Sequence, residues 1–259
     1  MSKTSLVEAA RHFDLEQVRK DLRKKPELKA FRTDQGFDLL QFCASRPTWG
    51  DRATANRQLR LAKWLVSEGF DPRVIHITKP GEDGEADPTP LSLVFIAIAR
   101  AQNNALARYF IDQGAKPMGL FAAAWWGNWE ILADLVKHGE DINLFVGATP
   151  LHMAVAVLLR DTEGKPELAR RRVKTVEEFF RLGADPNLPD HRGDTILHVA
   201  LDRGFDVSFF KLLLRHGANP DVPGQDGRSV RAIASRKRDK RYIDAIGDKR
   251  PRGSRESRN

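Results

Sequence analysis

The fold is decided by two similar stretches, GATPLHMAVAV at residues 147–157 and GDTILHVALDRG at residues 193–204. Each contains a threonine, Thr149 or Thr195, whose hydroxyl can cap the start of a helix. Pro150 follows at the first helical position, where a missing N–H costs nothing. The apolar residues after each threonine recur at helical spacing, so the pattern predicts a short amphipathic helix at each site.

A second pattern follows each copy further along the chain. It is clearest in FFRLGADPN at residues 179–187 and LLRHGANPD at residues 213–221, with weaker copies at 65–73, 109–117 and 135–143. Gly183 and Gly217 stand where a second helix must end in a left-handed residue. Successive copies lie about 33 residues apart where nothing is inserted, which indicates an internal repeat.

These motifs resemble the ankyrin family, whose repeat opens with Thr-Pro-Leu-His and closes with Gly-Ala-Asp and a hairpin. The resemblance covers about residues 5 to 246. It implies an all-α solenoid of about seven helix-turn-helix repeats with β-hairpin-type connections and terminal repeats as caps. The first helices are expected to start near Ser5, Asp38, Thr89, Met118, Thr149, Thr195 and Ser229, with Pro90 at the first helical position of the third repeat.

Several segments depart from the regular repeat. We expect one repeat domain over residues 1–246, with insertions near residues 46–57, 72–88 and 158–174. The tail, residues 247–259, has a basic composition typical of a disordered end. Because long loops in compact repeats often carry function, the insertions are candidates for partner contacts.

The net charge of +8 is concentrated at the C-terminal end. Residues 236–259 hold ten Lys or Arg and four Asp or Glu, a net of +6, which leaves +2 for the preceding 235 residues. A nearly neutral body argues against a phosphate-binding face over the whole surface. The tail could bind RNA, DNA or an acidic protein, or be merely a solvated end.

Nothing in the sequence resembles an active site, and we expect no catalytic residue, no metal ion and no cofactor. His152 and His198 occupy the fourth position of the Thr-Pro-Leu-His pattern, where the resemblance implies bridges between neighbouring repeats. The other histidines have no Cys or His partner at metal-ligand spacing. Cys43, the single cysteine, fits a small core position and excludes an internal disulfide.

Binding residues follow from the resemblance. In an ankyrin stack, the ends of the first helices and the hairpin tips line a concave surface. The residues at those positions, and hence the predicted contacts with a partner, are Arg11, His12, Arg46, Trp125, Trp126, His191, Arg192, Asp194, Asp202 and Arg203.

Paired tryptophans are the strongest local signal among these residues. Trp125 and Trp126 stand at nominally exposed positions, and tryptophan is one of the residue types that dominate interface hot spots. The alternative is that a shortened neighbouring hairpin lets both rings fold into the stack. Trp64 and Trp129 are expected in the core, and the place of Trp49 within an insertion stays open.

The sequence therefore predicts a non-enzymatic, cytoplasmic and monomeric protein that binds a partner protein through its concave face and loops. No signal peptide and no apolar run of membrane length is present. A narrower hypothesis is an inhibitor or immunity protein that neutralises a bacterial toxin or effector. The alternative from another class is a nucleic-acid-associated adaptor that works through the basic tail.

Overall fold

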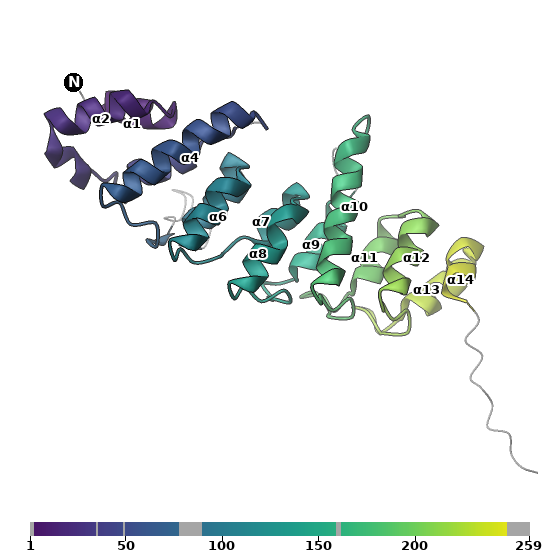
Figure 1. Ribbon diagram of the computed structural model, residues 1–259. Coiled ribbons are helices and arrows are strands. Elements are labelled where there is room, and N and C mark those ends of the chain that lie inside the picture. The colour runs from purple at the N-terminus through teal and green to yellow at the C-terminus, as the bar shows by residue number, and fades with distance from the viewer. Residues whose placement is uncertain (1–2, 35, 49, 78–89, 159–161, 248–259) are drawn as a thin grey trace, which may run out of the picture. The chain divides into compact units, whose positions relative to one another are not determined.

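The computed structural model describes residues 3–34, 36–48, 50–77, 90–158 and 162–247 (Figure 1). These residues form two compact units, residues 1–141 and 142–259, and each unit is described by itself. The single domain over residues 1–246 stays a prediction. Trp49 and most of the segment 72–88 lie outside the described residues, as does the tail beyond Gly247.

Unit 1 contains four successive helical pairs within its described part. Its elements are α1 (Lys3–Arg11), α2 (Leu15–Lys24), the 3-10 turn η1 (Pro26–Ala30), α3 (Leu39–Ala44), α4 (Arg52–Ser67), β1 (His76–Ile77), β2 (Pro90–Leu91), α5 (Leu93–Ile96), the π-turn η2 (Ala97–Ala101), α6 (Asn104–Asp112), α7 (Leu120–Trp126), the 3-10 turn η3 (Trp129–Ile131) and α8 (Leu132–Lys137). The short strands β1 and β2 pair antiparallel.

Unit 2 contains three pairs among its described residues. These are α9 (Pro150–Ala156) with α10 (Pro166–Arg181), α11 (Ile196–Asp202) with α12 (Val207–Arg215), and α13 (Val230–Lys237) with α14 (Lys240–Ile246). The first helices α9, α11 and α13 pack in a row, and α12 packs against α14 in the second row. Seven pairs in the described chain confirm the predicted helical solenoid.

Capping side chains set the starts of the first helices. The Thr149 hydroxyl accepts the backbone N–H of His152, and Pro150 occupies the first turn, as predicted. Asp38 and Thr195 each form a reciprocal capping box with the residue three positions later. These caps explain why polar residues such as Asp38 and Thr149 are buried at helix ends.

The prediction for the third repeat was wrong by one turn. A helix was expected to begin with Pro90, but Pro90 pairs with Ile77 in the strand pair and α5 begins at Leu93. Ser92 caps it, and its hydroxyl accepts the N–H of Phe95. The strand pairing keeps Pro90 extended, and the next hydroxyl along the chain takes over the cap.

Two of the predicted insertions end within long helices. The segment 46–57 runs into α4 and the segment 158–174 runs into α10, and both helices are 16 residues long (Figure 1). Gln58 on α4 donates to the Cys43 carbonyl at 2.8 Å, and Arg172 on α10 donates to the Val157 carbonyl at 2.5 Å. Each long second helix therefore satisfies carbonyl groups at the end of its own first helix.

Apolar side chains between the two rows of helices form the core of each unit. Phe110 and Leu65 are fully buried in unit 1, and Phe179 and Phe210 are fully buried in unit 2. Cys43 is also fully buried, and this burial raises the pKa of its thiol. Cys43 is thus a small apolar core residue, as predicted.

Candidate protein-binding surface

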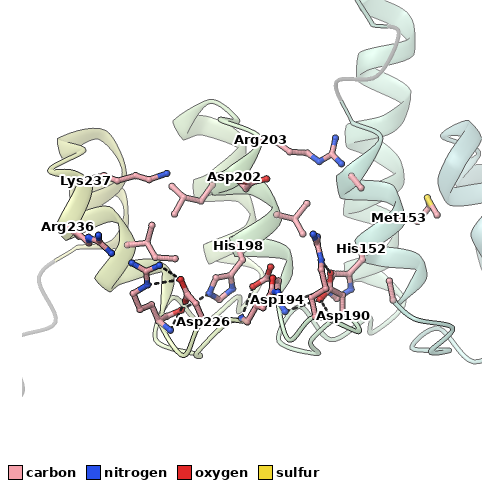
Figure 2. Close-up of a pocket in the computed structure, with 18 residues that line it drawn as sticks. His152, Met153, Asp190, Asp194, His198, Asp202, Arg203, Asp226, Arg236 and Lys237 are labelled. Carbon is pink, nitrogen blue, oxygen red and sulfur yellow. Dashed lines mark hydrogen bonds and ion pairs between the residues drawn. The ribbon is translucent and has the colours of Figure 1, made fainter.

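A groove of about 850 Å³ opens along the inner face of unit 2 (Figure 2). Its walls come from the first helices α9, α11 and α13 and from the hairpins before α11 and α13. The lining residues are Ala148, His152, Met153, Ala156, Asp190, Arg192, Asp194, His198, Val199, Leu201, Asp202, Arg203, Gln225, Asp226, Arg228, Ile233, Arg236 and Lys237.

The floor of the groove repeats one apolar position. Met153, Val199 and Ile233 each lie four residues after the cap of their helix, at Thr149, Thr195 and Ser229. All three side chains are half-buried and line the groove. Equivalent positions in successive repeats face the same way, so the floor is a row of apolar side chains that crosses three helices.

Two histidines fix the hairpins against the helices, as the resemblance to the ankyrin family implied. His152 Nδ1 lies 2.9 Å from the Thr149 hydroxyl, and its Nε2 lies 3.1 Å from the Asp194 carbonyl oxygen. His198 repeats this bridge from Thr195 to the Arg228 carbonyl. Burial lowers the pKa of His152, so its ring is neutral near pH 7 and serves a structural role as a hydrogen-bonding bridge.

The hairpin before α11 is held by its own aspartates. The Asp190 carboxylate accepts the N–H groups of Arg192 and Asp194 at 2.8 and 3.0 Å, and Asp194 accepts the N–H of Gln225 in the next hairpin. A Cβ on Gly224 would lie 2.6 Å from the Asp194 carboxylate, so the two hairpins can approach this closely only with glycine there.

Charges divide between the two sides of the groove. Asp190, Asp194 and Asp226 lie along the hairpin side, where Arg192 and Arg228 pair with two of them (Figure 2). The helix-end side carries Asp202 together with what we call the basic rim: Arg203, Arg236 and Lys237. These three side chains are exposed, and within the described part of the chain none forms a hydrogen bond or ion pair.

An exposed apolar hairpin tip adjoins the groove. Leu144, Phe145 and Val146, which we call the apolar tip, are 37%, 54% and 68% exposed. The carbonyl oxygen of the following residue, Gly147, accepts two hydrogen bonds from His191. The backbone N–H of His191 donates one at 2.6 Å, and its ring Nδ1 donates the other at 3.0 Å. Contiguous exposed apolar residues are costly in water, which makes this tip a candidate contact with a partner.

The predicted binding residues fall into two sets. Arg192, Asp194, Asp202 and Arg203 line the groove of unit 2, and His191 lies beside it on the bond to Gly147. The others, Arg11, His12, Arg46, Trp125 and Trp126, lie in unit 1 and do not line this groove. Their role as contacts stays a prediction.

Some of the predicted binding residues in unit 1 already form contacts within their own unit. Arg11 pairs with Glu8 at 2.8 Å and stacks on the ring of Phe42, and His12 lies 3.5 Å from the same carboxylate. Arg46 is exposed. These positions are accessible but carry weaker signals than the groove of unit 2.

The tryptophans differ from one another in burial. Trp126 is 41% exposed at the end of α7, whereas Trp125 is half-buried. Only Trp126 therefore fits the expected exposed position, and Trp125 lies partly in the stack. Trp64 and Trp129, expected in the core, are half-buried, and Trp64 packs under the guanidinium of Arg19.

Sequence reasoning missed the apolar tip and part of the basic rim. No role was predicted for Leu144, Phe145 and Val146, although they stand where the next hairpin carries Asp190, His191 and Arg192. That replacement of polar by apolar residues was the available signal. Arg236 and Lys237 were assigned to the basic end of the chain and not to the concave face.

Comparison with known proteins agrees with this geometry. The sequence pattern of the family described as "Ankyrin repeat" matches residues 192–225, which include the end of the hairpin before α11, the whole α11–α12 pair and the start of the next hairpin. The chain has the ankyrin-repeat fold, and residues 192–225 carry the sequence of one repeat. An ankyrin repeat protein, L92, of Acanthamoeba polyphaga mimivirus is 33% identical over 57 residues. That match covers 22% of this ankyrin-repeat chain and only 14% of the viral protein.

Solved ankyrin repeat domains share the fold. That of Bcl-3, described as a member of the IkappaB protein family, superimposes with a TM-score of 0.66 over 95% of this chain and 98% of its own, at 18% identity. The domain of human ASB11 gives a TM-score of 0.65 over 90% and 91% of the two chains, at 21% identity. At these identities the likeness concerns the fold alone.

Ankyrin repeats generally act as protein–protein interaction modules and are typically non-enzymatic. Among the described residues, no group of three His, Cys, Asp or Glu side chains is arranged to hold a metal ion. Over the same residues, none of the helices has both the length and the apolar character that crossing a membrane requires.

Proposed function

We propose that this ankyrin-repeat chain binds a partner protein through the groove of unit 2 and the adjoining apolar tip. The exposure of Phe145 and Val146 beside the groove carries the proposal. Transfer of exposed apolar side chains from water into contact with a partner lowers the free energy, and so favours binding. The bond between His191 and Gly147 fixes the tip before binding, so little conformational entropy is lost.

The experiment compares two matched variants in affinity capture from nuclease-treated lysate. Phe145→Ser with Val146→Ser removes the apolar tip, and Val74→Ser with Ile75→Ser removes two residues of unit 1 that are 42% and 39% exposed. Exposed substitutions of this kind change the free energy of unfolding by about 0.5 kcal/mol or less, so both variants should fold.

We expect one protein to be captured by the wild type and by the unit 1 control, and to be reduced about tenfold or more with the tip variant. Equal capture of the same proteins by all three chains would contradict the proposal. Capture that occurs in untreated lysate but vanishes in every chain after nuclease treatment would instead favour the nucleic-acid alternative, which depends on the basic tail.

The narrower hypothesis of an inhibitor or immunity protein is a further step within this proposal. It requires that the captured protein be an enzyme or toxin and that the complex block its activity. An activity assay of the captured protein with and without one equivalent of this chain tests that step. Unchanged activity would leave an adaptor role.

A further inference from the structure

The basic rim of the groove is built from corresponding positions in two repeats. Arg203 and Lys237 each lie eight residues after the cap of their first helix, and Arg236 precedes Lys237 on α13. Such cations at helix C-termini interact favourably with the helix dipole, which accounts for part of their placement. The dipole does not require that they line a groove beside an apolar floor.

The charges next to the rim are only partly balanced. Asp202 is the one carboxylate among the groove-lining residues of the helix-end side, so that side has a net charge of +2. The aspartates across the floor are engaged: Asp190 and Asp226 pair with arginines, and Asp194 accepts a backbone N–H. Cations without a partner at the edge of an apolar groove favour carboxylates on the occupant.

The spacing of the floor residues limits the shape of the occupant. Met153, Val199 and Ile233 lie on three neighbouring helices, and packed helices are about 8–10 Å apart. A chain in the extended polyproline II conformation has three residues per turn and advances about 3.1 Å per residue, so every third side chain faces the same way about 9 Å further along. An extended segment that crosses the floor can therefore place one apolar side chain on each helix at about every third residue.

We propose that the groove takes an extended acidic segment of the partner protein, with apolar side chains on the floor and carboxylates against the basic rim. This inference rests on the proposed function and names the chemistry of the partner. A nucleic acid fits less well, because its phosphates would run beside Asp190, Asp194, Asp202 and Asp226. A carboxylate segment can alternate charged and apolar side chains, as the groove does.

The test uses the full chain and four defined probes. Three 12-residue peptides share leucine at every third position and carry glutamate, glutamine or lysine elsewhere, and the fourth probe is a 20-nucleotide oligothymidylate. Binding is followed by NMR of the methionine methyl groups, because the chain has three methionines and only Met153 lines the groove. Met118 in unit 1 is the internal control.

We expect the glutamate peptide to shift the Met153 signal and to bind about tenfold more tightly than the glutamine or lysine peptide. Reversal of the rim by Arg203→Glu, Arg236→Glu and Lys237→Glu should abolish that preference. The matched control reverses Arg171, Lys211 and Arg215, three exposed cations that do not line the groove, and should bind like the wild type. Circular dichroism checks that both triple variants keep their helicity.

Three outcomes would overturn the inference. Equal binding of the three peptides at Met153 would show an apolar groove without charge selection and would leave the proposed function intact. Tighter binding of the oligonucleotide at Met153 would assign the groove to a polyanion. No shift of Met153 with any probe at millimolar concentration would rule out an extended acidic segment, while the capture experiment would still decide the proposed function.

Discussion

At the scale of single residues, His152 joins the first helix of one repeat to the hairpin of the next. Its two ring nitrogens contact the Thr149 hydroxyl and the Asp194 carbonyl, and the ring is buried. The resemblance to the ankyrin family implied this bridge, and it could be carried over because the motif that places the histidine is a local property of the sequence. The motif also placed the cap at Thr195 correctly, and Asp38, expected near the start of a first helix, caps α3.

His152 should make stability depend on pH. Burial lowers its pKa below the ordinary value of 6.5 in the folded chain, so between the folded and unfolded pKa values the unfolded chain binds a proton that the folded chain does not. The free energy of unfolding should therefore fall as the pH falls from about 7.5 to 5.5. Burial lowers the pKa of His76 as well, so part of the effect will remain in any His152 variant.

Urea unfolding of the wild type and of His152→Gln at both pH values measures this. Glutamine keeps a hydrogen-bonding amide but cannot ionise, so the variant should lose less stability on acidification than the wild type does. An equal or larger loss in the variant would show that His152 is not protonated on unfolding in this range.

The apolar tip is the residue-scale feature that the sequence did not reveal. The repeat places Leu144, Phe145 and Val146 at a hairpin position, but an apolar run of this kind usually lies in a core, and only the structure shows that it stays exposed. Exposure depends on which neighbouring segments cover a residue. That is a tertiary property, and local pattern does not contain it.

At the scale of elements, Glu140 replaces a missing cap on α7. The fourth repeat has Gly119 at the cap position, where later repeats have Thr149, Thr195 and Ser229, so no local hydroxyl can cap this helix. Both Glu140 oxygens accept the N–H of Gly119, at 3.1 and 2.9 Å, and one accepts the N–H of Leu120 at 3.0 Å. A side chain that follows α8 therefore starts α7.

Removal of this carboxylate should destabilise unit 1. Glu140→Ala leaves the N–H groups of Gly119 and Leu120 without an acceptor, which should cost about 1–2 kcal/mol of the free energy of unfolding. Glu140→Gln keeps an acceptor oxygen for these N–H groups. It also removes the buried charge, whose burial raises the pKa of Glu140. Glutamine should therefore lose less than alanine in urea unfolding, and an equal loss would contradict the capping role.

Longer elements were harder to predict than caps. The segments 46–57 and 158–174 were interpreted as insertions because they interrupt the repeat, yet α4 and α10 absorb much of both. Insertion by lengthening a second helix keeps the helical period, so periodicity alone cannot mark where the regular repeat resumes. The start of α5 was wrong for a related reason, since the pairing of β1 with β2 is not a local signal.

At the scale of the whole molecule, the repeat places equivalent residues of successive helices side by side, and together they form the floor of the groove. The same position after each cap supplies Met153, Val199 and Ile233, so the groove floor follows from the repeat once the repeat is recognised. The sequence also placed Arg192, Asp194, Asp202 and Arg203 on this face. It could not show which part of the concave face forms a groove, because the groove depends on how neighbouring hairpins and helix ends pack.

Amide hydrogen exchange of the full chain, with and without the captured partner, tests the central claim most directly. The account predicts slower exchange on binding at the tip and in the following hairpin, residues 144–147 and 190–194, and at the ends of α11 and α13, with little change in α10 and α12. Protection confined to unit 1 or to the outer helices α10 and α12 would contradict the assignment of this groove as the partner-binding surface.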